Sequence, residues 1–498
     1  AEVPHDLVER ITTRAQGNPF YIEELLNYLK DRGIDPRDTE ALEELDLPTS
    51  LHSLIISRLD QRTDSQKITL RVASVIGRLF QAALLWGMYP DLGTPERVKD
   101  DLEALCRVDL TRADTPEPEL AYLFKHIVTQ EVAYESLPYA TRAMLHEHLA
   151  QYIERAFGEA LDQYVDLLAY HYEHSKNEDK KREYLLRAGE AAQADYANAA
   201  AIEYFQRLLP LLPADEKVQV MLKLGDVLQL VGDWQEADDT YQEAMAIAEQ
   251  SGDRATSAWC QTAMGKLLWK QTQYAEALEW LGRAQGVFEE LGDKSGVGQV
   301  LQDEGTIFAQ QGELETARDF YEKSLAIRYE IGDKLHVGHV LNNLGIVARF
   351  RGDYEMAQAL QEEALKIRQE LGDKWAIAMS LNNLGNVYLD QGNYLAARTQ
   401  LEEAVSIQRE IGDRYYLASA LQSLGNVARD QGDYTASSPV YEESLTILWE
   451  LGEHWLLAHL LEDMGGLAAM RGQPERAFRL VGAAAALRET IGAPLSPA

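Results

Sequence analysis

Apolar residues in the C-terminal half of the chain recur at helical spacing. Between residues 333 and 351 they fall on Leu341, Leu344, Val347 and Ala348, which lie on one side of a helix. After a short polar break the pattern resumes and predicts a second helix that ends near Leu371. The sequence therefore predicts a pair of amphipathic helices joined by a tight turn.

Glycines repeat this unit every 40 residues. One set consists of Gly225, Gly265, Gly305, Gly345, Gly385, Gly425 and Gly465, and a second set follows each unit from Gly252 to Gly492. A third set of glycines marks the turn inside each unit, except in one unit where Thr272 replaces the glycine. A fixed period of this length, returning seven times, is the signature of a stacked-repeat architecture.

The residues between the helices explain the turns. Gly352 is expected to take a positive φ after the first helix, and Asp353 to cap the second. Gly345 lies on the apolar side of its helix, where we expect the close approach of a partner helix. Pro439 falls inside a second helix and is expected to kink or weaken it. One hairpin cannot bury its apolar face alone, so the fold class is a mostly α solenoid.

The motif Leu344-Gly345, Gly352, Tyr354, Ala357 and Ala364 resembles the tetratricopeptide repeat in order and spacing. The unit is longer than the usual repeat of about 34 residues. It is similar to the longer subclass found in Pins/LGN-type adaptors and in many bacterial signalling proteins. The resemblance implies a right-handed α-solenoid over residues 215–498 that binds a peptide or protein partner.

The first helix of each repeat is expected to line the concave face of such a solenoid. Counted from the repeated glycine, that face carries His339, Asn342, Asn343, Arg349, Asn382, Asn383, Asn386, Gln422, Ser423, Asn426 and Arg429. Clustered amides suit an extended peptide, because each amide can pair with a backbone N–H or C=O. The alternative is an inner surface that is merely solvated.

The N-terminal region has a different pattern. Helices are predicted over 6–15, 21–31 and 51–59, and then over 66–76, 81–88 and 95–107. Two short extended runs follow, at 108–112 and 120–124. Three helices and a hairpin indicate a winged-helix domain over 63–138. Its third helix carries four acidic residues, so we do not expect it to read DNA.

Two short motifs in this region resemble STAND-type signalling ATPases, which are related to the NB-ARC and MalT-like families. They are Gly17-Asn18-Pro19 and, about 107 residues later, Phe124-Lys125-His126. The resemblance implies that residues 1–62 are a helical lid segment, that Pro19 packs on adenine, and that His126 binds the diphosphate of ADP. Lys125 and Ile127 depart from the Met-His-Asp form of the family's motif.

No phosphate-binding G-x-x-x-x-G-K-[ST] motif occurs in the chain. We therefore expect no cofactor and no enzyme activity here, with ADP or ATP bound only by a longer parent protein that supplies this loop. The chain begins without methionine and is expected to be a fragment. Such a parent could carry a cyclase, kinase or DNA-binding output domain and could oligomerise on activation.

The composition further limits the classes of partner that the chain is expected to bind. The formal net charge is −34, which disfavours nucleic acid because phosphates would be repelled. No apolar run is long enough for a membrane span. The two cysteines, Cys106 and Cys260, are far apart, which fits a cytoplasmic protein. Residues 139–214 read as a helical linker, where His171 and His174 share a helix face without enough ligands for a metal.

Two functions from different classes remain. The first is the regulatory and sensor portion of a STAND-type signalling protein, in which the array senses a partner and the front end gates a nucleotide switch. The second is a self-standing tetratricopeptide adaptor whose front end is vestigial. A phosphate-binding loop encoded upstream of Ala1 would favour the first.

Overall fold

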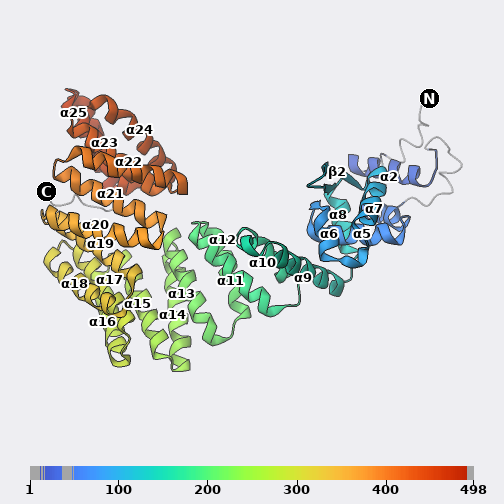
Figure 1. Cartoon of the computed structure of the whole chain (residues 1–498), viewed down its shortest axis with the longest axis horizontal. Helices are drawn as coiled ribbons and strands as arrows, with labels where there is room; N and C mark the ends of the chain where they lie inside the picture. The colour runs from blue at the N-terminus through green and yellow to red at the C-terminus, as the bar shows by residue number, and fades with distance from the viewer. Residues whose placement is uncertain (1–11, 13–14, 16, 36–47, 49, 491–498) are drawn as a thin grey trace. The chain divides into compact units, whose positions relative to one another are not determined.

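The computed structural model describes residues 12, 15, 17–35, 48 and 50–490. The chain divides into two compact units, residues 1–240 and 241–498 (Figure 1). Apart from residues 12 and 15, the helix predicted over 6–15 lies outside the described residues. Among the described residues, no helix combines the length and the apolar character that crossing a membrane requires.

A three-stranded antiparallel sheet lies in the first unit, packed with three helices. These elements are α5 (Asp64–Ile76), β1 (Leu79–Gln81), α6 (Ala82–Met88), α7 (Pro95–Arg107), β2 (Thr111–Thr115) and β3 (Ala121–Phe124). The strand order is β1-β3-β2, with Leu79 opposite Leu123 and Thr111 opposite Phe124. The three predicted helices are confirmed. Strand β1 was missed, because three residues are too few to show an alternating pattern.

The first predicted extended run differs from the structure in its position. Residue Val108 ends α7, and Asp109 takes a positive φ of 58° that turns the chain. The strand therefore begins at Thr111 and not at Val108. The second run, predicted over 120–124, is confirmed as β3.

Helices make up the rest of the first unit. They are α2 (Pro19–Asp31), α4 (Leu51–Asp60), η1 (Pro90–Leu92), α8 (Ile127–Glu135), α9 (Tyr139–Ala156), η2 (Gly158–Tyr164), α10 (Val165–Glu173), α11 (Glu178–Ala194), α12 (Asn198–Leu208), η3 (Leu209–Leu211) and α13 (Ala214–Val231). Residues 140–214 are helical apart from short turns, as predicted. Helix α14 (Trp234–Ser251) follows α13 in the chain.

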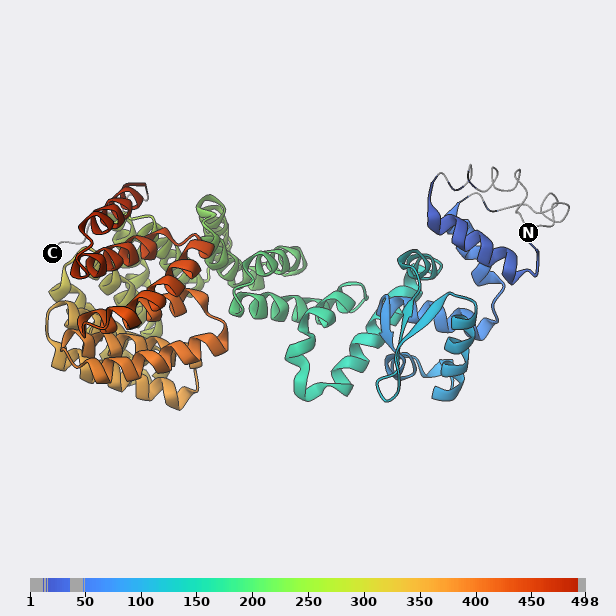
Figure 2. The same cartoon turned by 90° about the horizontal axis from the view of Figure 1, so that it is seen from above.

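Helical hairpins stack one after another in the second unit (Figure 1, Figure 2). The pairs are α15 (Arg254–Lys270) with α16 (Tyr274–Leu291), α17 (Lys294–Gln310) with α18 (Leu314–Ile331), α19 (Lys334–Phe350) with α20 (Tyr354–Leu371), α21 (Lys374–Asp390) with α22 (Tyr394–Ile411), α23 (Arg414–Asp430) with α24 (Tyr434–Leu451), and α25 (His454–Met470) with α26 (Pro474–Thr490). The predicted fold class is confirmed, and Pro439 lies inside α24 as expected.

The turns of these hairpins have the predicted chemistry. Gly352 takes a φ of +77°, and Asp353 accepts a hydrogen bond from the backbone N–H of Met356 at 3.2 Å. Thr272 stands where the other repeats have glycine and still takes a φ of +62°. The backbone N–H of Thr272 donates to the carbonyl of Trp269 at 2.9 Å, so the turn closes in the left-handed region although a side chain disfavours it.

The repeated glycine permits the two helices of a hairpin to approach closely. A Cβ atom on Gly385 would lie 2.6 Å from Cγ of Leu401, and one on Gly425 would lie 2.3 Å from the ring of Tyr441. At Gly345 the neighbour is the amide of Gln361, also at 2.6 Å. These distances are too short for an unshifted side chain, so the expected close approach at Gly345 is confirmed.

Candidate functional site

The residues predicted for binding lie on the first helices α19, α21 and α23, at equivalent positions of successive repeats. Asn342, Asn382 and Ser423 are buried. The remaining members of the set are half-buried: His339, Asn343, Arg349, Asn383, Asn386, Gln422, Asn426 and Arg429. The structure thus brings them into columns across neighbouring repeats, although none of them is well exposed.

Three asparagines form a hydrogen-bonded cluster between α19 and α21. Asn383 donates from Nδ2 to Oδ1 of Asn342 at 2.8 Å, and Asn342 donates from Nδ2 to Oδ1 of Asn343 at 3.5 Å. Gln361 of α20 donates to the backbone carbonyl of Asn342 at 2.9 Å. Asn382 differs, because its side chain is only 8% exposed and its Oδ1 receives no hydrogen bond within the described part of the chain.

At the next pair of repeats, three predicted residues converge on one carboxylate. Gln422 and Asn426 donate to Oδ2 of Asp463 at 2.6 and 3.2 Å, and Arg429 donates to its Oδ1 at 3.0 Å. Asp463 lies on α25, at the position that Ser423 holds on α23. These contacts join α23 to α25. Asp463 was not among the predicted residues, although the sequence places it one 40-residue period after Ser423.

Two more of the predicted residues interact with neighbouring side chains of the chain itself. Arg349 donates from Nε to Oδ2 of Asp390 at 2.5 Å, which joins α19 to α21. Burial, followed by the nearby Arg368 and His336, lowers the pKa of His339 to about 4. The imidazole of His339 is therefore neutral at pH 7.

Helix α17 carries an acidic pair that was not predicted. Gln299 donates from Nε2 to Oδ1 of Asp303 at 3.0 Å, and Lys266 Nζ lies 3.5 Å from its Oδ2. Burial raises the pKa of Asp303, and burial with the charge of Asp303 raises the pKa of Glu304 to about 7. The missed signal is that Glu304 stands where Leu344 and Leu384 occupy the core in later repeats.

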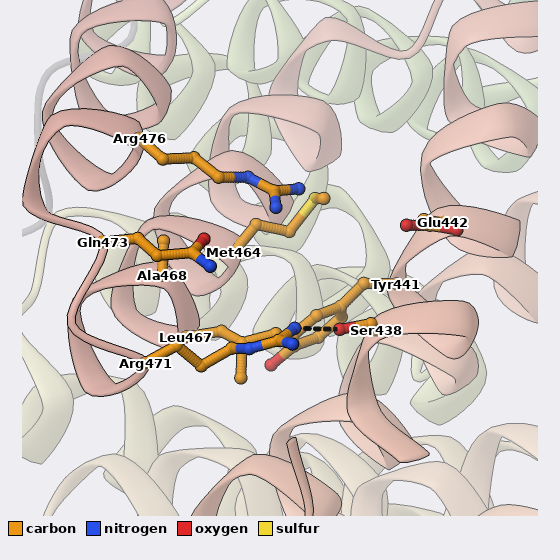
Figure 3. Close-up of a pocket in the computed structure, with 9 residues that line it drawn as sticks. All are labelled: Ser438, Tyr441, Glu442, Met464, Leu467, Ala468, Arg471, Gln473 and Arg476. Carbon is orange, nitrogen blue, oxygen red and sulfur yellow. Dashed lines mark hydrogen bonds between the residues drawn. The ribbon is translucent and has the colours of Figure 1, made fainter. Parts of the chain in front are cut away.

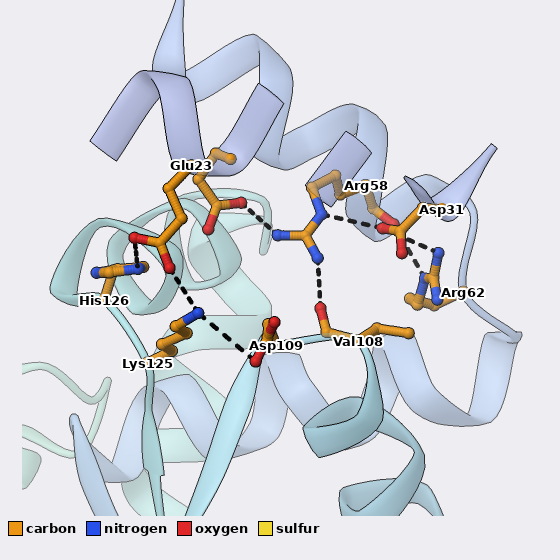
Figure 4. Close-up of polar contacts among 9 residues, drawn as sticks. Glu23, Asp31, Arg58, Arg62, Val108, Asp109, Lys125 and His126 are labelled. Carbon is orange, nitrogen blue, oxygen red and sulfur yellow. Dashed lines mark hydrogen bonds and ion pairs between the residues drawn. The ribbon is translucent and has the colours of Figure 1, made fainter. Parts of the chain in front are cut away.

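The structure places α2, which begins with Pro19 of the first N-terminal motif, against Lys125 and His126 of the second motif (Figure 4). Pro19 is the first residue of α2, and His126 is the N-cap of α8. The ring of Phe20 lies edge-on to His126 with centroids 5.0 Å apart. Glu23 of α2 pairs with Lys125 at 2.6 Å and lies 3.5 Å from His126 Nε2. The carboxylate of Glu23 therefore contacts Lys125 and His126 of the second motif.

A buried arginine holds the same helices in place (Figure 4). Arg58 is fully buried and donates from Nε to Oδ2 of Asp31 at 3.0 Å. It also donates to Glu24 and to the backbone carbonyl of Val108. All of its nitrogens have partners, so Arg58 joins α2, α4 and the end of α7 through one polar network.

The two histidines predicted on one helix face are joined by a third. His146 of α9 lies with its Nδ1 2.8 Å from Nδ1 of His171, and its ring is 5.1 Å from that of His174. Burial lowers the pKa of His146 and of His171 to about 3, so both are neutral. Within the described ranges, no group of histidine, cysteine and acidic side chains could hold a metal ion.

A small pocket lies between α24, α25 and α26 (Figure 3). Arg471, Gln473 and Arg476 line it together with the buried Tyr441. Arg471 donates from Nη1 to Oγ of Ser438 at 3.0 Å, which occupies one side of the pocket. None of the residues predicted for binding lines it.

Comparison with known proteins identifies the repeats. Five overlapping segments, 217–290, 261–330, 298–370, 336–410 and 376–450, match the tetratricopeptide repeat family. An uncharacterised protein of Rhizobium meliloti (strain 1021) is 27% identical over 268 residues, which are 51% of this chain and 25% of the relative. The matched region thus spans a quarter of that relative's length.

Two solved structures share the fold. One is a Signal Transduction ATPase with Numerous Domains (STAND) protein with a tetratricopeptide repeat sensor from Pyrococcus horikoshii, with 15% identity, a TM-score of 0.55, and coverage of 95% of this chain and 68% of that chain. The other is a Rap protein complexed with Competence and Sporulation Factor, with 14% identity, a TM-score of 0.51, and coverage of 71% and 99%. The C-terminal part of this chain is therefore an array of tetratricopeptide repeats, which supports a protein-interaction or regulatory role.

Proposed function

We propose that the array is a sensor region that binds an extended segment of a partner protein across α19 and α21. The binding residues are Asn342, Asn343, Asn382, Asn383 and Asn386, named here the asparagine cluster. The observation that carries the proposal is Asn382 Oδ1, a buried acceptor that receives no hydrogen bond from any described residue. Such an acceptor costs about 1–3 kcal/mol, and a backbone N–H of a bound segment would offset that cost.

The chemistry of the cluster supports this kind of ligand. An amide side chain offers both a donor and an acceptor, so it can pair with the backbone of a segment of any sequence. Asn343 and Asn383 are half-buried one repeat apart, and Asn386 lies one helical turn after Asn382. Among proteins with this fold, the Rap protein was solved with Competence and Sporulation Factor bound, and the STAND protein has a tetratricopeptide repeat sensor.

Selection from a random library of linear peptides tests the proposal. The immobilised chain should enrich peptides whose affinity falls roughly 5- to 150-fold when Asn382 is changed to alanine, the equivalent of ~1–3 kcal/mol. The double variant Asn343→Ala/Asn383→Ala should lose affinity by a similar factor. Gln369→Ala, on the exposed face of α20, is the matched control. Equal affinity for all variants would refute the proposal.

A second proposal concerns residues 1–138, as a helical lid segment (1–62) and a winged-helix domain (63–138) of a STAND-type switch. It is supported by the contact of Phe20 with His126, because it joins the two motifs that the resemblance assigns to adenine and diphosphate. In a longer protein with a phosphate-binding loop, Pro19 and His126 would contact ADP and hold the closed state. In this view 139–214 is a helical linker and 215–498 is the sensor.

The nucleotide proposal is tested in such a longer protein. A hydrogen bond to a charged group is worth about 1.5–3 kcal/mol, so His126→Ala should speed ADP release by roughly ten- to a hundred-fold. Exchange of a fluorescent ADP analogue measures this rate. Unchanged release would return His126 to a structural role. Absence of a phosphate-binding loop upstream would favour a self-standing adaptor instead.

A further inference from the structure

The asparagine cluster is the middle of a longer polar strip. The strip consists of two columns on the first helices: Gln302, Asn342, Asn382 and Gln422 in one, and Asp303, Asn343, Asn383, Ser423 and Asp463 in the other. Members of a column are 40 residues apart. The amides are thus flanked by an aspartate at each end, on α17 and on α25, and we name this set the amide strip.

The two terminal aspartates are satisfied to different degrees. Asp463 receives hydrogen bonds from Gln422, Asn426 and Arg429, which cover both of its oxygens. Asp303 receives one hydrogen bond, from Gln299 to its Oδ1. Its Oδ2 has only Lys266 Nζ at 3.5 Å, longer than the roughly 2.7–2.9 Å of a charge-assisted hydrogen bond.

The charge at Asp303 is correspondingly under-compensated. Its side chain is 9% exposed, and the acidic Glu304 follows it directly. Burial raises the pKa of Asp303 although Lys266 opposes that rise. The side chain of Lys266 is a third exposed, and its flexible four-carbon stem lets the ammonium group turn toward solvent.

The buried atoms of the amide strip that lack a hydrogen-bond partner are all acceptors. They are Gln302 Oε1, Asp303 Oδ2 and Asn382 Oδ1. The neighbouring donors are already used, since Asn342 and Asn383 donate to other members of the cluster. A ligand that fits these positions must bring donors: backbone N–H groups at the amides and a cation at the carboxylate. The net charge of −34 draws cationic segments in the same way.

We infer that the bound segment carries a lysine or arginine whose side chain pairs with Asp303 Oδ2 in exchange for Lys266. The inference rests on the proposed function. It adds the chemical class of one residue of the bound segment and the direction in which the segment lies. The basic residue lies at the α17 end of the amide strip. The α25 end selects no charge, because Asp463 is saturated by the protein's own donors.

Peptide selection with four forms of the chain tests this inference. The wild-type chain should enrich linear peptides that share one lysine or arginine. Asp303→Asn keeps the size of the side chain and the acceptor for Gln299, and it should abolish selection for the basic residue while peptides are still enriched. Lys266→Met should strengthen that selection. Asp319→Asn, an exposed site on α18, should select as wild type.

Synthetic peptides give the quantitative test. A selected basic peptide should bind Asp303→Asn roughly tenfold or more weakly than wild type, whereas its version with norleucine at the basic position should bind both forms equally. A basic preference retained in Asp303→Asn, or its absence in the wild type, overturns the inference but leaves the proposed function standing. No enrichment by any form of the chain overturns both.

Discussion

Asn383 donates a hydrogen bond from Nδ2 to Oδ1 of Asn342, 2.8 Å away and one repeat earlier in the chain. Asn342 and Asn383 stand at adjacent positions of the repeat pattern, so the contact crosses from one column of amides to the other, with Asn342 as the acceptor and Asn383 as the donor. It also leaves Asn382, the direct counterpart of Asn342, with a buried oxygen that no described residue pairs. The hydrogen bonds of the asparagine cluster therefore do not repeat from one unit to the next.

Substitution of the repeated glycine should destabilise the array by an amount that depends on the side chain packed opposite it. Gly425→Ala should lower the free energy of unfolding by ~1–3 kcal/mol, since the new methyl would meet the buried ring of Tyr441 at 2.3 Å. Gly345→Ala should cost less, because the end of the Gln361 side chain can move. Gly345→Leu should cost at least as much as Gly425→Ala. Urea denaturation followed by circular dichroism measures these changes.

A glycine of α16 is the control for this series. A Cβ on Gly282 meets nothing within 4 Å, so Gly282→Ala should stabilise the chain by up to about 1 kcal/mol through helix propensity. If Gly425→Ala also stabilises it, the close approach of the paired helices is wrong.

Glu304 should make the second unit less stable as the pH rises. The pKa of this carboxyl in the folded chain is raised to about 7, with burial as the largest cause and the charge of Asp303 as the next. Lys323 opposes the rise. A raised carboxyl pKa leaves stability intact below the unfolded value of about 4.3 and removes it as the pH climbs through 7. The expected loss is about 3 kcal/mol.

Glu304→Leu restores the residue type of later repeats and tests this expectation. The variant should be more stable than the wild type, and its advantage should be larger at pH 8 than at pH 5. Glu304→Gln, which keeps the polarity but cannot ionise, should lose the same pH dependence. Denaturation midpoints across this range would contradict the assignment if the difference between wild type and Glu304→Leu were constant.

Removal of the arginine alone from the Arg58 network should strongly destabilise the protein. Arg58→Met leaves Glu24 buried without its cation and Asp31 with Arg62 alone, which should destabilise the packing of α2 and α4 by about 3–5 kcal/mol. Hydrogen exchange of these two helices reports the loss. The triple variant Arg58→Met/Glu24→Gln/Asp31→Asn should recover much of it, because no buried charge remains. Equal exchange in the single and triple variants would argue against a charge effect.

Loss of the Asp463 carboxylate should destabilise the array more than loss of the Asp430 carboxylate. Asp463→Ala removes the acceptor shared by Gln422, Asn426 and Arg429, and we expect a loss of about 1–3 kcal/mol at the junction of α23 and α25. Asp430→Ala removes one contact, with Arg429 at 2.7 Å, and should cost less. Hydrogen exchange of α25 distinguishes the two, and an equal effect would show that the shared acceptor is unimportant.

Much of the fold follows from local pattern. The apolar spacing and the glycine period predict the paired helices of the array, and Asp353 and Gly352 act at their turns as expected. The same reasoning finds α5, α6 and α7 and one of the two longer strands. It misses β1 because the strand exists only through its pairing with β3.

By itself, then, the sequence determined the repeat, its turns and the amides on its first helices, because helix periodicity and positive φ are properties of neighbouring residues. Only the tertiary structure decided which of these amides are paired. The partner of Asn383 is 41 residues away, and Asp463 is 41 and 34 residues from Gln422 and Arg429. Whether a polar side chain is available to a ligand depends on such contacts between repeats. The periodic pattern cannot express them, since it describes every repeat alike.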